Sequence, residues 1–410
     1  MNFWLLLLIS VFAVCSSEPA LKAVVVVFRH GDRTPVRPYP TDPYKNRSYW
    51  PEDWGMLTNT GKRQHYELGQ YFRQRYADFL PEEYSERDIF VRSTDVDRTL
   101  MSAEADLAGL YPPIKTDIWD NNLLWQPIPI HTTPENMDAV LAEKKPCKKH
   151  GYLLKQLLKN DYFRNISHTY HDLYAYLTRN SGDTISDLTH LEYLYNTFYI
   201  ETLYNYTLPE WAQKVYPTKM KYLASLSFAI NTYTSDLARL KTGPFFNELI
   251  NYFKNRSATE DNAIYYAPKF LMFSSHDTIV ANLLNSMGAF EYHNPPYTAT
   301  VLFELYKSSG RSYVKVFYKN TTDARLVSVH NCESECDLEK FIEILKPITL
   351  TLEEWESECN SLLFDTWHLY LLLISLLFFV SSCGFYIFVL VRNCKSENNM
   401  YTQLPDEECA

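Results

Sequence analysis

This 410-residue chain has few glycines and no net positive charge, and each of these features excludes a class of protein. There are 11 glycines against 32 tyrosines, and 46% of the residues are hydrophobic, so a large low-complexity or disordered region is not expected. The formal net charge is -10, whereas a nucleic-acid partner would require clustered basic surface. The composition therefore predicts a folded protein with a sizeable core that binds no nucleic acid.

Charged side chains are missing from one segment near each end of the chain. Phe3–Val14 is an apolar run followed by small residues, which is typical of a secretory signal peptide over residues 1–17. Its first residues include no Lys or Arg, and a membrane anchor or a buried strand is the alternative. Residues 367–391 contain no Asp, Glu, Lys or Arg, which predicts a transmembrane helix. The alternative there is a core helix, but a core helix is rarely apolar on every face.

The residues after this second segment predict its orientation. Arg392 and Lys395 follow it directly, so the positive-inside rule places residues 392–410 in the cytosol. The chain is then a single-pass type I membrane protein with a lumenal or extracellular ectodomain. A GPI signal is disfavoured because a charged tail follows. Residues 401–404 are similar to a tyrosine-based sorting signal, so lysosomal or endosomal membranes and the cell surface both stay open.

Cysteine is absent between Cys147 and Cys332, and the ectodomain has four cysteines after the signal peptide. They are Cys147, Cys332, Cys336 and Cys359, and an oxidising lumen allows three pairings among them. The paired CxxC or HxxxH spacing of zinc sites is missing, so no metal is predicted. Glycosylation sequons occur at Asn46, Asn165, Asn205, Asn255 and Asn320, which fits a lumenal or extracellular surface.

Hydrophobic patterns predict an α/β fold. Apolar runs indicate strands at residues 22–28, 89–91, 270–273, 299–306 and 313–318. Helical patterns favour helices at 60–79 and 99–110 and through most of 151–250. We therefore expect a mixed central sheet flanked by helices, with a mostly helical cap inserted in it. The predicted limits are 18–150 for the first part of the core, 151–250 for the cap and 251–362 for the second part of the core.

Polar residues that suit phosphate chemistry follow the predicted strands. They are Arg29, His30 and Arg33 after the first strand, Arg98 after the second, and His276 and Asp277 after the third. Ligands of open α/β sheets bind at the carboxyl ends of strands, and guanidinium groups recognise oxyanions such as a phosphoryl group. A neutral histidine can attack phosphorus, and arginines can replace metal ions in the electrostatics. The pattern predicts phosphoryl transfer without a cofactor, at mildly acidic pH if Asp277 acts as an acid.

These motifs resemble the histidine acid phosphatase family, most closely its prostatic and lysosomal branch. The matching segments are Arg29-His30-Gly31-Asp32-Arg33-Thr34-Pro35, Arg92–Ala103, His276-Asp277, Gln64–Gly69 and Leu124–Pro129. The resemblance runs from Val24 to Cys359. It implies that His30 is the phosphorylated nucleophile and Asp277 the proton donor. It also implies that phosphate binds Arg29, Arg33, Arg98 and His276.

The resemblance implies further properties. Cys147 would pair with Cys359 and Cys332 with Cys336, and members are often homodimers. Vertebrate members have a third disulfide in the cap that this chain lacks, which puts cap rigidity and substrate reach in question. Expected substrates are small phosphate monoesters or phosphoproteins. The alternatives are a phytase-like or carbohydrate-phosphate phosphatase and a catalytically silent phosphate-binding receptor.

Overall fold

A computed structural model of the chain describes residues 18–258, 268–361 and 366–401. The chain divides into one compact unit that ends at Asn360 and a second that starts at Ser361. The predicted signal peptide at residues 1–17 and the last nine residues of the predicted cytosolic tail lie outside the described residues.

The first unit is built on a mixed sheet of eight strands in the described part of the chain, in the order β3-β2-β4-β1-β5-β6-β7, with β8 paired to β6. The strands are β1 (Ala20–Arg29), β2 (Ile89–Thr94), β3 (His131–Thr133), β4 (Phe270–Ser275), β5 (Thr300–Ser308), β6 (Arg311–Lys319), β7 (Ala324–Val327) and β8 (Cys336–Asp337). Strands β1 to β4 pair parallel with one another, whereas β5 pairs antiparallel with β1 and β6, and β6 pairs antiparallel with β7 and β8. The predicted α/β class with a mixed central sheet is confirmed.

Strand register places the carboxyl ends of β1, β2 and β4 side by side. Arg29 of β1 is the partner of Ser275 on β4, and Ser93 of β2 is the partner of Ser274. The residues that follow these strands therefore emerge at one edge of the sheet. Strand β1 is central and buried on both faces, so its unbroken valine run satisfies both layers of the core.

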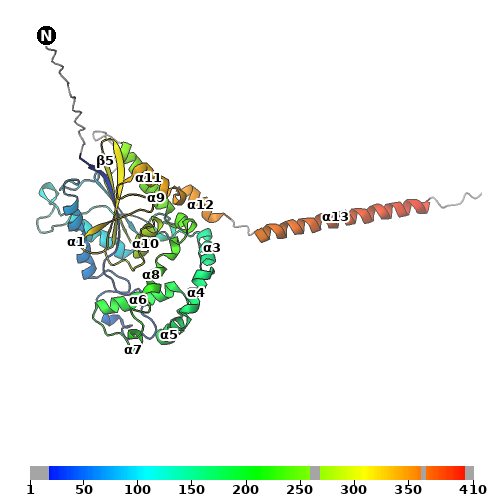
Figure 1. Ribbon diagram of the computed structural model, residues 1–410, viewed down its shortest axis with the longest axis horizontal. Helices are drawn as coiled ribbons and strands as arrows, with labels where there is room; N and C mark the ends of the chain where they lie inside the picture. Colours follow the sequence, from blue (N-terminus) through cyan, green and yellow to red (C-terminus); the bar gives the residue numbers. More distant parts are fainter. Residues whose placement is uncertain (1–17, 259–267, 362–365, 402–410) are drawn as a thin grey trace, which may run out of the picture. The chain divides into compact units, whose positions relative to one another are not determined.

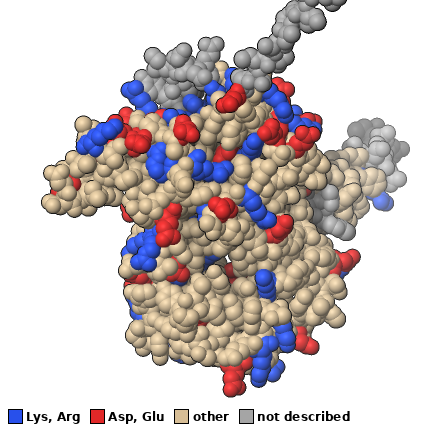
Figure 2. All heavy atoms as spheres, turned by 60° about the vertical axis from the view of Figure 1, so that its left-hand side comes forward, with Lys and Arg blue, Asp and Glu red and all other residues tan. Residues whose placement is uncertain are grey.

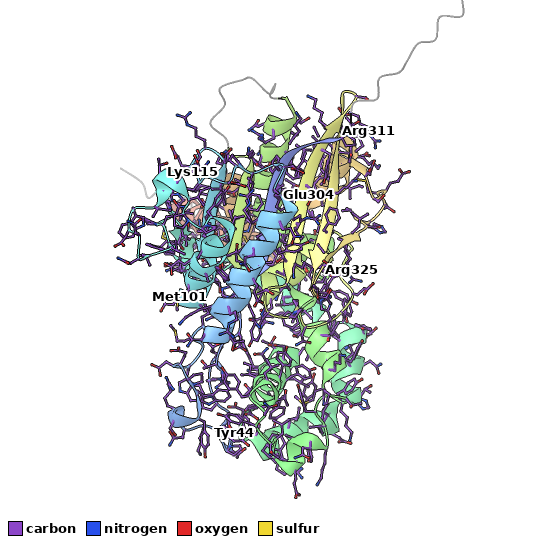
Figure 3. The ribbon with its side chains drawn as sticks, turned by 90° about the vertical axis from the view of Figure 1, so that its left-hand side faces the viewer. Tyr44, Met101, Lys115, Glu304, Arg311 and Arg325 are labelled. Atoms are coloured by element: carbon purple, nitrogen blue, oxygen red, sulfur yellow. A yellow bond between two sulfur atoms is a disulfide. The ribbon has the colours of Figure 1, made fainter. Side chains whose placement is uncertain are left out.

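Helices cover both faces of the sheet (Figures 1 and 3). One face packs against α1 (Asn59–Arg75) and α2 (Asp97–Leu110), and the other packs against α9 (Ser235–Ala258), α10 (Asp277–Ser286) and α11 (Leu338–Leu345). Two of the few glycines let α1 and α2 touch, because a Cβ on Gly69 would lie 1.9 Å from the Asp106 carbonyl oxygen and one on Gly109 would lie 2.1 Å from that of Tyr66. This contact holds the last turns of α2 against α1, and the first turn of the same helix carries Arg98.

A helical cap forms a separate apolar cluster at one end of this unit (Figure 1). Its helices are α4 (Asp161–Thr169), α5 (His171–Ser181), α6 (Leu188–Leu203), α7 (Glu210–Gln213) and α8 (Lys221–Ser227). The cap cluster ends at Leu237, whereas Phe245 and Phe253 of the same helix α9 pack in the sheet's core. By packing, most of α9 belongs to the core, although the predicted insertion extended to residue 250. Tyr39, from the long loop after β1, packs into the cap and ties it to the first part of the core.

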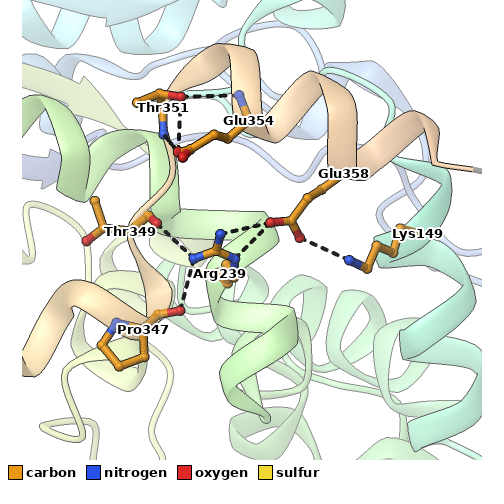
Figure 4. A network of polar contacts seen from close by, with 7 residues as sticks. All are labelled: Lys149, Arg239, Pro347, Thr349, Thr351, Glu354 and Glu358. Atoms are coloured by element: carbon orange, nitrogen blue, oxygen red, sulfur yellow. Dashed lines mark hydrogen bonds and ion pairs between the residues drawn. The ribbon is translucent and has the colours of Figure 1, made fainter.

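A disulfide and an ion-pair network hold the last helix of the first unit in place. Cys147, at the start of α3 (Lys148–Leu157), is bonded to Cys359 of α12 (Leu352–Asn360) with an S–S distance of 2.02 Å. Arg239 of α9 donates to Glu358 Oε1 from Nε at 3.0 Å and from Nη2 at 2.8 Å, and Lys149 Nζ lies 3.0 Å from Glu358 Oε2 (Figure 4). The second disulfide joins Cys332 to Cys336.

The remaining helices are short, except for one. The short 3-10 helices are η1 (Arg47–Tyr49), η2 (Lys115–Asp117), η3 (Glu135–Met137), η4 (Ile230–Thr232) and η5 (Lys346–Ile348). The second unit contains α13 (Thr366–Tyr401), whose segment Leu369–Asn393 is long and apolar enough to cross a membrane, with a mean hydropathy of 2.4. Among the residues with a described structure, it is the one helix with that length and composition.

Candidate active site

The residues predicted from the strand ends meet in one cavity of about 350 Å³. Its lining includes His30, Arg33, Arg98, His276 and Asp277 from the core. Arg29 lies buried beside it and contacts Asp277. Outside the cavity, the face in Figure 2 carries acidic and basic side chains interspersed rather than a basic patch. The positive charge is thus gathered inside, where it can recognise a small oxyanion.

The hydrogen bond of His30 determines which ring nitrogen is free. Nδ1 lies 2.8 Å from the carbonyl oxygen of Gly31, which can only accept, so Nδ1 carries the hydrogen. In the neutral ring, Nε2 then has the lone pair. Burial, followed by the charges of Arg98 and Arg29, holds the pKa of His30 well below its usual value. The imidazole therefore stays neutral and nucleophilic at acidic pH, where an ordinary histidine would be protonated.

Gly31 allows α1 to approach the loop after His30 closely. A Cβ at this position would lie 2.4 Å from the carbonyl oxygen of Gly61, in the first turn of α1. The backbone of Gly31 also donates to the Ser102 hydroxyl at 3.2 Å. Helices α1 and α2 therefore both hold the loop that presents the histidine.

Three arginines surround the cavity with donors that are only partly used. Arg33 donates from Nη1 to the Thr34 carbonyl at 3.1 Å and from Nη2 to Asn196 Oδ1 at 3.2 Å. Within the described part of the chain, the buried Nε atoms of Arg33 and Arg98 make no hydrogen bond. Burial and the charge of Arg33 lower the pKa of Arg98 to about 10, which leaves it charged at acidic and neutral pH. An oxyanion in the cavity would satisfy these donors.

Arg29 and Asp277 form a buried ion pair. Arg29 Nη2 lies 2.9 Å from Asp277 Oδ2, and Arg29 Nη1 donates to the carbonyl of Pro295. Burial acts to raise the pKa of Asp277, but the charges of Arg29 and Arg33 and a backbone hydrogen bond from Thr278 outweigh it and bring the pKa below its usual value. Asp277 is therefore ionised in the ligand-free protein even at mildly acidic pH. Its predicted role as proton donor stays a prediction that requires a source for the proton.

His276 sits between the strand ends as a neutral group. Its Nε2 lies 3.1 Å from the hydroxyl of Thr94, and its ring meets that of His30 edge-on with centroids 5.6 Å apart. Burial, followed by the charge of Arg98, lowers its pKa to about 3. His276 can thus offer a hydrogen bond to an oxyanion without adding charge.

Two residues of the matching motifs, Asp32 and His65, hold the backbone around His30 by hydrogen bonds. Asp32 accepts a hydrogen bond from the Thr58 hydroxyl, and the same hydroxyl caps the start of α1. His65 is fully buried, and its Nε2 lies 3.2 Å from the carbonyl oxygen of Arg29, to which it donates. These contacts fix the backbone on both sides of His30.

Sequence reasoning missed the contribution of the cap. Glu192, Tyr193 and Asn196 of α6 line the same cavity as His30 and Asp277. Burial and the charge of Asp277 raise the pKa of Glu192 to about 8. In the sequence these residues stand in an ordinary helical pattern with no motif around them, so the one available signal was a carboxylate on a cap helix.

The other predicted sites have less to do with the cavity. Asn46, Asn165, Asn205 and Asn255 are exposed, whereas Asn320 is half-buried, and their glycosylation stays a prediction. No group of three or more His, Cys, Asp or Glu side chains that could hold a metal ion occurs among the described residues.

Known proteins resemble this chain over most of its length. The model of the histidine phosphatase superfamily (branch 2) matches residues 20–319. Human prostatic acid phosphatase is 40% identical over 347 residues, which cover 83% of this chain and 88% of that protein. Lysosomal acid phosphatase of Xenopus laevis is 37% identical over 348 residues, covering 83% and 79%.

Solved structures with the same fold include bacterial phytases. The phytase of Citrobacter braakii has a TM-score of 0.59 at 19% identity and covers 83% of this chain and 99% of its own. Hafnia alvei phytase in complex with tartrate has a TM-score of 0.60 at 18% identity, covering 81% and 98%. At this identity the likeness is one of fold alone. The family model and the acid phosphatase relatives together show that the chain belongs to the histidine phosphatase superfamily, branch 2.

Proposed function

We propose that this protein is an acid phosphatase that hydrolyses phosphate monoesters through a phosphohistidine on His30. The observation that carries the proposal is the hydrogen bond from His30 Nδ1 to Gly31, which leaves a neutral Nε2 lone pair in a cavity lined by Arg33 and Arg98. A site that only bound phosphate would need the cations but no neutral nucleophile among them. The acid phosphatase names of the relatives support the same activity.

The reaction follows from the arrangement in two steps. Arg29, Arg33, Arg98 and His276 bind the phosphoryl oxygens, and Nε2 of His30 forms a bond to phosphorus as the ester P–O bond breaks. The leaving oxygen takes a proton from Asp277, and water then attacks the phosphohistidine, returning a proton to Asp277 as the N–P bond breaks. A bound phosphate would compete for Arg29 and repel the Asp277 carboxylate, and both effects raise its proton affinity.

The substrates that fit best are simple monoesters with a partly apolar leaving group. A second cavity of about 270 Å³ adjoins the first and shares Arg33 and Asn196 with it. Its walls include Pro38, Tyr39 and Ile185, which would accept an aryl or alkyl group. Phosphoproteins as substrates and a homodimeric state are further proposals that rest on the family.

We also propose that α13 anchors the enzyme as a single-pass type I protein, with the site on the lumenal or extracellular side. The apolar stretch in α13, the two disulfides of the first unit and the lysosomal names of some relatives support this placement. Lysosomal or endosomal membranes and the cell surface are the candidate locations.

The test is phosphate release from 4-nitrophenyl phosphate by the full chain in detergent at about pH 5, where an unperturbed carboxyl group begins to hold its proton. We expect activity in the wild type and a loss of more than about 10³-fold in His30→Ala. His168→Ala is the control, because it removes an exposed histidine of cap helix α4. Phosphate binding without turnover would instead identify a silent receptor, and full activity in His30→Ala would contradict the mechanism.

A further inference from the structure

Asp277, the proposed proton donor, is ionised when no phosphate is bound. Asp277 Oδ2 lies 2.9 Å from Arg29 Nη2, and the charges of Arg29 and Arg33 bring the pKa of Asp277 below its usual value. An acid that must protonate a leaving oxygen needs a proton at the start of each turnover. The proton must therefore come from solvent or from another group of the cavity.

Glu192 is a carboxyl group in the same cavity that nothing in the proposed mechanism uses. It lies on α6 and lines the cavity together with His30 and Asp277. Asn196, one helical turn further along α6, accepts a hydrogen bond from Arg33 at 3.2 Å. That bond ties the Glu192 face of the cap helix to the arginines that would bind phosphate.

The charges around Glu192 come from several elements. Arg29 of β1 and Arg33 of the following loop act on it from one side, and Asp277 of α10 acts with the opposite sign. The same cavity also contains Arg98 of α2, Glu135 of η3, and Lys144. Burial is the largest influence, Asp277 adds to it, and together they raise the pKa of Glu192 to about 8 in spite of the two arginines. Glu192 and Asp277 are thus carboxyl groups of one cavity whose proton affinities are shifted in opposite directions, a pattern typical of acid–base pairs.

We propose that Glu192 is the proton reservoir of this site: it holds the proton in the ligand-free enzyme and passes it to Asp277 once phosphate is bound. The inference rests on the proposed phosphatase function and adds a residue to it. When the phosphoryl group occupies Arg29, the ion pair of Asp277 weakens and its carboxylate becomes the better base. The Glu192 O–H bond then breaks and an Asp277 O–H bond forms, directly or through one water.

The proton balance closes over one turnover. Asp277 gives the proton to the leaving oxygen as the ester P–O bond breaks, and both carboxyl groups are then ionised. Water that attacks the phosphohistidine returns one proton to Asp277. When inorganic phosphate leaves, Arg29 pairs with Asp277 again and the proton returns to Glu192. Glu192 therefore acts through Asp277: it stores the proton between turnovers and does not bind the phosphate.

The proposal predicts a specific change in pH dependence. The pH profile of kcat/KM reports the ionisations of the free enzyme, so its alkaline limb should follow Glu192. In Glu192→Gln, the proton must come from solvent onto an Asp277 that is ionised in the free enzyme. For glycerol 2-phosphate, a poor leaving group, we expect kcat/KM at pH 7 to fall by more than about tenfold, with a loss below about threefold near pH 4.5. The leaving group of 4-nitrophenyl phosphate departs with less need of a proton. For this substrate the loss of kcat/KM in Glu192→Gln should therefore differ less between the two pH values.

The matched control is Glu135→Gln, which removes a carboxyl group of the same cavity from the core side. Glu135→Gln should leave the alkaline limb of the kcat/KM profile at its wild-type position. Glu192→Asp should shift that limb less than Glu192→Gln does. An equal loss at both pH values would indicate a structural role and overturn the proposal. An unshifted limb in Glu192→Gln would overturn it as well.

A second measurement does not depend on turnover. Infrared difference titration of the full chain should show a protonated carboxyl component that persists to about neutral pH and is lost in Glu192→Gln, whereas the bands of other buried carboxyl groups such as Glu143 and Glu201 stay in both proteins. Identical spectra for the wild type and Glu192→Gln would overturn the reservoir. A wild type inactive on 4-nitrophenyl phosphate would instead count against the phosphatase function, so the two failures can be told apart.

Discussion

The sheet core and the helical cap contribute to the same cavity by different means. The core places His30, Arg98 and His276 through strand register, because each follows a strand whose neighbours are fixed by backbone hydrogen bonds. The cap places Glu192 through the packing of α6 in an apolar cluster and through the Asn196–Arg33 hydrogen bond. His30, which must be positioned precisely to attack phosphorus, is thus held by the sheet. Glu192, which would store the proton, is held by side-chain packing.

The two regions also differ in charge. The core supplies the cations of the cavity, whereas the cap supplies carboxyl groups with raised pKa values, the half-buried Glu192 in the cavity and the buried Glu201 away from it. Glu201 of α6 is fully buried, and burial together with the charge of Asp42, in the loop after β1, raises the pKa of Glu201 to about 9. Glu201 is therefore protonated in the folded protein at acidic and neutral pH.

The largest effect is expected from the core. Arg98→Ala removes a half-buried cation of the cavity and should lower kcat/KM for 4-nitrophenyl phosphate by about 10²–10³-fold, because phosphate charge is then less well neutralised. Arg179→Ala, on the exposed surface of α5, is the control in the same steady-state assay. A loss smaller than that caused by Asn196→Ala would reverse the roles given to core and cap.

Asp277→Asn should have a large effect that depends on the leaving group. We expect a loss of about 10²-fold in kcat/KM with glycerol 2-phosphate and a loss below about tenfold with 4-nitrophenyl phosphate, since the aryl oxide departs without a full proton. Rates with a series of phenyl phosphates of graded leaving-group acidity would measure this dependence. Equal losses across the series would count against Asp277 as the donor.

A smaller effect is expected in the stability of the cap. Burial and the charge of Asp42 raise the pKa of Glu201 from 4.5 to about 9, so the folded state holds a proton that the unfolded chain releases between these values. This stabilisation is full below pH 4.5 and is lost as the pH rises toward 9. Glu201→Gln needs no proton, so its loss of unfolding free energy between pH 5 and 8 should be smaller by ~2 kcal/mol. Chemical denaturation at the two pH values would show it, and identical pH dependence would mean that Glu201 is not protonated.

The core was the more predictable region, and the reason is physical. Strands β1, β2 and β4 are short apolar runs followed at once by polar residues, a pattern that marks both a buried strand and its functional end. Strand β3 is three residues long and polar, so it has no such pattern. The motifs after the strands therefore predicted His30, Arg98 and Asp277, which the structure brings together.

The contribution of the cap was not predictable in this way. Glu192 stands in a helix whose apolar positions are explained by packing, and only the tertiary fold shows that its side chain lines the cavity. The limit of the cap was also hidden, because α9 continues without a break from Leu237 in the cap cluster to Phe253 in the core. The ionised state of Asp277 depends on Arg29, which is adjacent only in space.

The central claim is that His30 takes the phosphoryl group. The most direct measurement is to quench the full chain with alkali during turnover of a ³²P-labelled monoester and to locate the label by peptide mapping. The account predicts a label that is stable in alkali and labile in acid, on the peptide containing His30, and absent from His30→Ala. A label on another residue, or turnover in His30→Ala at the wild-type rate, would contradict it.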